Sequence, residues 1–447
     1  MATQAAPAAG AIRAVAHPLR GTSADFDRLM RRIGDAHFVL IGEASHGTHE
    51  FYRIRAEITK RLIREKGFTA VAVEADWPDA FRVNRFVRGR GTDADAADAL
   101  SGFRRFPQWM WRNADVLDFI GWLRAYNETA IGPHRPAGFY GLDLYSLHAS
   151  MEAVLAYLRT VDPDAARRAQ ARYACFDHAG PDLHRYGAAT QLGLTPSCER
   201  EVIAQLVELQ RAAGEYAKRD GRLEPDALFY AEQNARVVRN AEAYYRAAVS
   251  GGVQSWNLRD RHMAETLGLL AEYLGRGGEN VKIVVWAHNS HLGDATWTEL
   301  GTHGELNVGQ LVREQHARDA VLVGFTTFSG TVTAASDWDA PAERKHVRPA
   351  LAGSYEQLFH SAGIGNFLLL FDHGHELAWA LDEPRLERAI GVVYRPETER
   401  ASHYFSASLS RQFDAVFHYD VTRAVEPLER NALWDRGELP ETYPTAL

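Results

Sequence analysis

Short runs of apolar, mostly β-branched or aromatic residues recur along the chain and are typical of buried strands. We expect strands at residues 38–41, 70–73, 139–142, 281–286, 321–325, 367–371 and 390–394. After the first run, apolar residues recur at three- and four-residue spacing from Phe51 to Leu62, and Gly67 stands where a helix would end. The succession of strand, helix and strand over residues 38–74 predicts a parallel sheet.

The strand pattern stops between residues 147 and 275, where helical periodicity with polar faces replaces it. We therefore predict an α/β fold: a central, mostly parallel sheet flanked by helices, with an inserted helical subdomain. The predicted division is a flexible leader at residues 1–21, a first part of the α/β core at 22–146, the helical insertion at 147–275 and a second part of the core at 276–447.

Composition narrows the functional classes. Of the 447 residues, 46% are hydrophobic and 24% charged, as in an ordinary globular protein. Lys and Arg number 50 against 58 Asp and Glu, and the resulting net charge of −8 argues against a nucleic acid partner. No apolar run reaches the length of about 18 residues that a membrane span needs. Cys175 and Cys198 are too few for a disulfide scaffold, which favours a reducing, cytoplasmic location.

Ionisable residues end four of the expected strands. They are Glu43, Glu74, Asp143 and His288. Ligands of open α/β sheets bind outside the carboxyl ends of the strands, so three carboxylates and an imidazole should converge at one edge. The simpler interpretation, that a charged residue marks the point where a buried strand reaches the surface, suits any one of them. The four together favour a site.

The loop after the first strand, residues 42–50, is the densest in chemistry. Its two glycines, Gly42 and Gly47, permit a tight turn, and a helix expected from Thr48 points its free N–H groups back at that turn. An anion or oxyanion would be stabilised there. His46 lies in the loop and is free to face the strand ends, whereas His49 falls in the first helical turn, where a solvated or capping role is equally open.

Elimination leaves water as the nucleophile. The spacing around Ser45 does not match the Gly-x-Ser-x-Gly motif of serine hydrolases, and the His-Glu-x-x-His zinc motif is absent. The two cysteines have no compelling partner. Activation of water needs a base whose pKa is near neutrality, and we assign this role to His46, which would contribute about 10²- to 10⁴-fold.

Three further side chains are candidates for stabilising charge. Arg55 lies two turns into the expected helix, and its side chain can reach back to the loop, although a surface ion pair is an equal alternative. His288 and His291 stand three residues apart just past a strand. Their spacing suits oxyanion stabilisation, substrate protonation, metal ligation or a structural turn.

Several segments taken together resemble the erythromycin esterase family, whose members open macrolide lactones. The resemblance lies in residues 41–48, 73–76 and 286–291, and it continues through 390–400 and 412–415. It therefore covers most of the chain. Residues 394–400 resemble a branch of the family that is widespread in bacteria more than they resemble the antibiotic-resistance enzymes that act on macrolides.

This resemblance implies an ester hydrolase, either metal-independent or metal-assisted, in which a histidine matching His46 deprotonates water. It implies that Glu43 and Glu74 orient His46 and the water, and that Arg55 and His288 stabilise the tetrahedral oxyanion. We expect no cofactor, and we expect a small-molecule ester as the partner. The sequence does not indicate an oligomeric state.

The helical insertion would roof a cleft above the strand ends, where we expect His291, Asp143 and Trp256 to bind substrate. Core packing is the alternative for Trp256, as it is for Tyr244 and Tyr245. Two other functions stay open at this point. One is metal-dependent hydrolysis, with Glu43, His46, Glu74 and His288 as ligands. The other is a non-catalytic binding or biosynthetic accessory protein that uses the same pocket for recognition.

Overall fold

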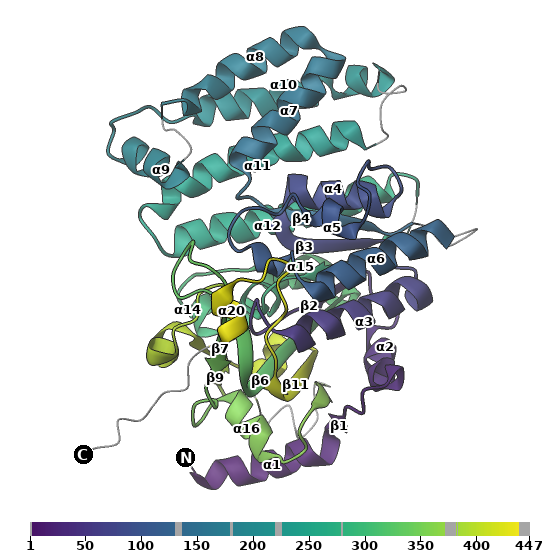
Figure 1. Ribbon diagram of the computed structural model, residues 1–447, viewed down its shortest axis with the longest axis vertical. Helices are drawn as coiled ribbons and strands as arrows, with labels where there is room; N and C mark the ends of the chain where they lie inside the picture. The colour runs from purple at the N-terminus through teal and green to yellow at the C-terminus, as the bar shows by residue number, and fades with distance from the viewer. Residues whose placement is uncertain are drawn as a thin grey trace.

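A nine-stranded sheet forms the centre of the protein in the computed structural model, which describes residues 2–129, 136–178, 182–219, 226–278, 280–371, 381 and 383–437 (Figure 1). The strands are β1 (His17–Pro18), β2 (Phe38–Ile41), β3 (Ala70–Asp76), β4 (Gly138–Asp143), β5 (Ile283–Trp286), β6 (Ala320–Ala334), β7 (Glu343–Val347), β8 (Phe367–Leu370) and β11 (Ala415–Thr422). Their order is β1-β8-β11-β6-β2-β5-β3-β4, and β7 pairs with β6. The six neighbours from β11 to β4 are parallel, whereas β1, β7 and β8 pair antiparallel, so the expected mostly parallel sheet is confirmed.

Helices cover both faces of the sheet because alternate side chains of its buried strands face opposite ways. Val39 and Ile41 of β2 pack into one hydrophobic cluster, and Phe38 and Leu40 pack into another. The first cluster includes α2 (Asp27–Ile33), α3 (His49–Lys66), α5 (Ala96–Leu100) and α6 (Ala114–Thr129). The second includes α1 (Ala2–Val15), α12 (Val253–Gly275), α15 (Val308–His316) and α16 (Tyr355–Ser361). The helix α4 (Trp77–Val87) contributes to both.

The described elements between β4 and β5 are all helical, as the loss of the strand pattern predicts. They are α7 (Leu147–Val161), α8 (Pro163–Tyr173), α9 (Leu183–Gln191), α10 (Glu199–Arg219), α11 (Ala227–Ala248) and α12. Helices α7 to α11 form the upper tier of Figure 1 around a hydrophobic cluster of their own, and α12 leads back to the sheet. The expected domain boundaries stay a prediction.

A disulfide joins Cys175 and Cys198 within this helical tier, with their Cα atoms 5.8 Å apart. This pairing differs from the sequence-based expectation of two reduced thiols. The sequence separation of 23 residues did not reveal that the turn after α8 lies beside the start of α10.

The first residues also differ from the expected flexible leader. Helix α1 packs Ala8, Ala9 and Ile12 into the core, and Arg13 Nε donates to the Ala362 carbonyl over 2.9 Å. Strand β1 then pairs with β8. The small apolar stripe of α1 is enough to hold the segment because α16 offers it an apolar partner.

The expected strand at residues 390–394 is wrong. Ile390 and Val393 instead make isolated bridges to Ser45 and Ala335, so this segment runs along the loop after β2. The sequence reading missed β11, a central strand, and the small antiparallel pair β9 (Arg385–Arg388) and β10 (Tyr404–Ala407). The remaining short helices are α13 (Asn289–Leu292), α14 (Glu299–Thr302), α18 (Glu399–Ser402), α19 (Leu409–Gln412) and α20 (Ala432–Arg436).

Candidate active site

The loop between β2 and α3 is held tightly enough that two of its positions accept only glycine. A Cβ atom at Gly42 would lie 2.2 Å from Asn289 Oδ1, and one at Gly47 would lie 1.8 Å from the Thr333 carbonyl oxygen. The backbone N–H of His46 donates to the Ile390 carbonyl over 3.3 Å. These contacts fix the position from which the His46 side chain projects.

Glu43 links His46 to a buried arginine. His46 Nδ1 donates to Glu43 Oε1 over 2.9 Å, and Arg55 Nη2 lies 2.7 Å from Glu43 Oε2. A carboxylate only accepts, so the Nδ1 of His46 carries a proton and the lone pair of the neutral ring is on Nε2. The arrangement therefore leaves Nε2 of His46 as a base.

Arg55 does not face the pocket. Its guanidinium lies over the rings of Tyr52 and Trp286, at 4.5 and 5.2 Å from their centroids, and the side chain is 1% exposed. Arg55 is therefore not placed to make the expected contact with an oxyanion. The rings of Tyr52 and Trp286 and the Glu43 carboxylate hold its guanidinium outside the pocket lining. Its contact is with Glu43.

His288 lies beside His46, with the two ring centroids 4.9 Å apart. The backbone N–H of Ser290 donates to His288 Nδ1 over 3.2 Å, so a neutral ring carries its proton on Nε2. Burial and the neighbouring His46 lower the pKa of His288 well below its usual range, against the pull of Glu74. His288 therefore stays neutral.

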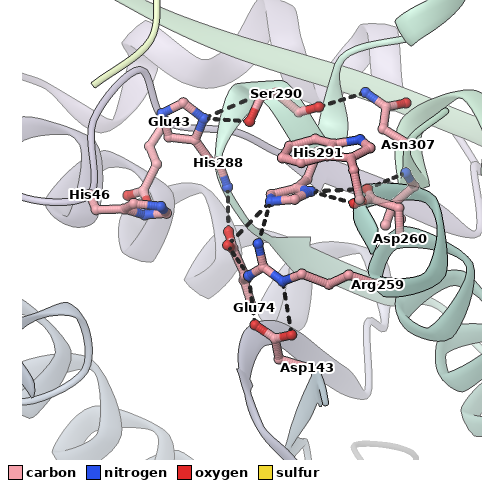
Figure 2. Close-up of polar contacts among 12 residues, drawn as sticks. Glu43, His46, Glu74, Asp143, Arg259, Asp260, His288, Ser290, His291 and Asn307 are labelled. Atoms are coloured by element: carbon pink, nitrogen blue, oxygen red, sulfur yellow. Dashed lines mark hydrogen bonds and ion pairs between the residues drawn. The ribbon is translucent and has the colours of Figure 1, made fainter. Parts of the chain in front are cut away.

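Glu74 connects the strand ends, as Figure 2 shows. Its Oε2 accepts from the His288 backbone N–H over 2.9 Å, and its Oε1 accepts from Arg259 Nη2 over 2.7 Å. Burial would raise the pKa of Glu74, but the charges of His291, His46 and Arg259 together with the His288 N–H outweigh it and lower the pKa. Glu74 consequently stays ionised.

Arg259, on α12, contacts Glu74, Asp143 and His291, and the sequence analysis did not identify it as a candidate. Its Nε and Nη2 donate to the two oxygens of Asp143 over 3.0 and 2.6 Å, and its Nη1 lies 3.0 Å from His291 Nε2 (Figure 2). The guanidinium thus joins the ends of β3 and β4 to the segment after β5. Nothing in the sequence around Arg259 distinguishes it from an arginine on the surface of a helix.

His291 lies between Arg259 and Asp260 and contacts both. Its Nδ1 donates to Asp260, with both carboxylate oxygens at 2.9 Å, and its ring stacks on Trp256 at 4.5 Å and 9°. Burial would lower the pKa of His291, but Asp260 and Glu74 outweigh it and raise the pKa. Asp260 lies on the same buried face of α12 as the apolar positions 263, 267 and 270. An acid on this apolar face is the sequence feature from which Asp260 could have been predicted.

A pocket of ≈ 200 Å³ opens at this edge of the sheet. Among the residues that line it are His46, Glu74, Asp143 and Arg259, together with the aromatic side chains of Phe103, Phe106, Trp111, Tyr145 and Trp338. Glu43, His288, His291 and Trp256 do not line the pocket. Glu43 contacts the lining residue His46, His288 contacts Glu74, and His291 contacts Arg259. Trp256 stacks on His291. Of the three expected substrate-binding residues, only Asp143 lines the pocket.

Other candidates are placed elsewhere. His49 Nδ1 lies 2.8 Å from Asp115 of α6, and the buried Ser45 hydroxyl bonds that of Thr48. Tyr244 shares a hydrogen bond of 3.1 Å with Tyr145, and Tyr245 is buried in the core of the helical tier.

Among the described residues, no three His, Cys, Asp or Glu side chains are arranged to hold a metal ion. No helix among those residues is long and apolar enough to cross a bilayer.

Comparisons with solved structures agree on the fold. A Bacillus cereus protein of known crystal structure superposes with a TM-score of 0.75 at 19% identity, covering 95% of this chain and 99% of that one. A succinoglycan biosynthesis protein gives 0.73 at 22% identity, with 96% and 100% covered. An erythromycin esterase mutant in its open conformation gives 0.67 at 17% identity, with 93% and 99% covered.

Sequence comparison gives the family. The chain is 24% identical over 421 residues to "Erythromycin esterase type II" of Escherichia coli, covering 90% of this chain and 93% of the relative. It is 22% identical over 432 residues to "Putative hydrolase YbfO" of Bacillus subtilis (strain 168), with 90% and 88% covered. These names support a hydrolase. Because the family model named Erythromycin esterase matches residues 63–422, the chain belongs to the erythromycin esterase family.

Proposed function

We propose that the protein hydrolyses a carboxylic ester or lactone with a water molecule that His46 activates. The observation that carries this proposal is the hydrogen bond of 2.9 Å from His46 Nδ1 to Glu43, in a histidine that lines the pocket. It leaves the basic Nε2 of His46 as the nitrogen that accepts a proton from water.

The reaction balances with water as the only co-reactant. His46 Nε2 takes one proton from water while the hydroxide oxygen adds to the carbonyl carbon, which gives a tetrahedral alkoxide. The carbon–oxygen bond to the leaving group then breaks, and the imidazolium returns its proton to the leaving oxygen. The products are a carboxylic acid and an alcohol, which stay on one molecule when the substrate is a lactone.

Two charges act on His46 during this step. Glu43 accepts from Nδ1, and the ionised Glu74 attracts the imidazolium, because the pKa of Glu74 is lowered in part by His46. A hydrogen bond in which one partner is charged contributes about 1.5–3 kcal/mol. Both carboxylates therefore stabilise the protonated state through which the reaction passes.

We assign stabilisation of the oxyanion to Arg259 in place of Arg55. Arg259 lines the pocket, and one proton of its Nη1 remains after the contact with His291. Loss of one such donor typically costs about 2.7–4 kcal/mol of transition-state stabilisation. The neighbouring His288, kept neutral by burial and His46, supplies a second N–H beside the base.

The test is turnover by His46→Gln, with His49→Gln as the matched control. The substrates are chromogenic carboxylic esters and a panel of macrolide lactones. We expect His46→Gln to lower kcat by about 10²- to 10⁴-fold, the usual contribution of a positioned base. His49 contacts Asp115 outside the pocket, so His49→Gln should keep activity within about twofold. Equal activity of the two variants would end the proposal.

Chelation addresses the metal-dependent alternative. In the part of the chain that the structure describes, no three His, Cys, Asp or Glu side chains are arranged to hold a metal ion, and both oxygens of Glu74 are already bonded to protein groups. We therefore expect EDTA dialysis to leave turnover unchanged, and loss of turnover that Zn²⁺ or Mn²⁺ restores would contradict this. The macrolide substrate, a role in antibiotic resistance and the cytoplasmic location stay predictions.

A further inference from the structure

Two carboxylates at the start of α4 line the pocket but take no part in the proposed hydrolysis. They belong to Asp76, the last residue of β3, and to Asp79, three positions later. We propose that Asp76 and Asp79 bind a protonated or quaternary ammonium group of the substrate. The proposal rests on the proposed hydrolysis only in that this group belongs to the ester.

Asp76 has an unsatisfied oxygen. The residue is 6% exposed, and its Oδ2 accepts from Arg105 Nε over 2.9 Å, whereas its Oδ1 accepts no hydrogen bond from any described residue. A buried polar group without a partner costs about 1–3 kcal/mol, and a charged one costs more. A donor that arrives with the substrate would remove this cost.

Helix capping does not explain the two acids. Asp76 is the residue before the first turn of α4 and Asp79 lies within that turn, where carboxylates usually accept from free backbone N–H groups. Asp76 makes no cap hydrogen bond, and no described backbone N–H donates to Asp79. Capping therefore leaves Asp79 and the Oδ1 atom of Asp76 without a partner among the described residues.

The cations around Asp79 are engaged elsewhere. Arg82 Nε donates to Asp93 over 3.0 Å, Arg104 Nε donates to the Ser101 carbonyl over 3.1 Å, and Arg105 pairs with Asp76. No described residue donates a hydrogen bond to Asp79. Burial and the neighbouring Asp76 raise the pKa of Asp79 to about 7, against the opposing arginines.

The charge of the pocket lining points the same way. Four carboxylates and two guanidiniums line it. Arg259 pairs with Glu74 and Asp143, and Arg105 pairs with Asp76, so both positive charges are neutralised within the wall. With Asp79 ionised, above its pKa of about 7, the lining keeps an excess of negative charge that attracts a cation.

The other walls favour an organic cation over a metal ion. Phe103, Phe106, Trp111 and Trp338 line the same pocket, and the rings of Phe106 and Trp338 lie 5.0 Å apart. Aromatic faces attract ammonium groups and are the usual surroundings of quaternary ammonium ligands in proteins. A hard metal ion instead needs about six oxygen ligands, which two carboxylates do not supply.

Binding of an isosteric probe pair tests the site without any turnover. The probes are phenyltrimethylammonium and the neutral tert-butylbenzene, titrated calorimetrically into the full-length protein and its variants. We expect the cation to bind at least tenfold more tightly, and we expect Asp79→Asn to abolish that preference. The exposed Asp118 of α6 provides the control Asp118→Asn, which changes the net charge equally and should keep the preference.

Equal affinity for the two probes would overturn the proposal, as would a preference that survives in both Asp79→Asn and Asp76→Asn. Asp79 has no described partner to lose, so its variant stays informative even if Asp76→Asn, which gives up the charge that pairs with Arg105, does not fold. A retained preference in a protein that hydrolyses no ester would support the ammonium site and refute the hydrolysis.

Discussion

Replacing Glu43 with Gln removes the single charge shared by His46 and Arg55. The carboxylate lies 2.9 Å from His46 Nδ1 and 2.7 Å from Arg55 Nη2, and its side chain is 2% exposed. One substitution therefore perturbs both the base and a buried ion pair. The two consequences can be measured separately.

The effect on the reaction follows from the hydrogen bond to the imidazolium. Such a charge-assisted bond contributes about 1.5–3 kcal/mol, which corresponds to about 10- to 160-fold in rate. We expect kcat for a chromogenic ester to fall within this range with little change in KM. The effect on stability is larger, because a buried arginine that loses its partner costs about 3–5 kcal/mol of unfolding free energy.

A double variant separates the two effects. In Glu43→Gln/Arg55→Met the buried charge is removed together with its partner, so urea unfolding should recover most of the lost stability. Turnover should stay low because His46 still lacks its carboxylate. Wild-type turnover by Glu43→Gln, or turnover that recovers along with stability in the double variant, would refute the role given to Glu43.

Further predictions concern packing and pH. Gly47→Ala places a methyl group 1.8 Å from the Thr333 carbonyl oxygen, so we expect a loss of unfolding free energy at or above the about 1–3 kcal/mol typical of overpacking, measured by urea unfolding. Gly121 on α6 has open space around its Cβ position, and Gly121→Ala is the control that should not destabilise. The pKa of Glu74 is lower in the folded protein than its usual value of 4.5, so its contribution to stability is complete above that value and is lost as the pH falls towards the folded pKa. Glu74→Gln should therefore be less stable than wild type at pH 7 and should lose less stability between pH 6 and pH 3, and identical acid unfolding profiles would contradict this.

The strand pattern predicted a site at this edge of the sheet because parallel strands end at a common edge. Buried runs are apolar on both faces, so β2 to β6 stood out in the sequence. Of the four ionisable residues at the strand ends, Glu74 and Asp143 line the pocket, whereas Glu43 and His288 contact the lining residues His46 and Glu74.

By contrast, the sequence analysis did not predict β11, because His418 and Asp420 interrupt its apolar run. The segment at residues 390–394 is as apolar as a strand, yet it makes only isolated bridges, from Ile390 to the loop after β2 and from Val393 to Ala335 just after β6.

The sequence by itself determined the local features: the parallel α/β core, the glycine-flanked loop, and the position of His46 before the helix with His49 within it. Those features depend on periodicity and backbone conformation, which neighbouring residues dictate. Only the tertiary structure decided which arginine faces the pocket. Both arginines lie on helices, but Arg55 is covered by Tyr52 and Trp286, while Arg259 reaches Asp143 across 116 residues of chain. Contacts between segments so far apart depend on how the helices pack, and no local pattern encodes that.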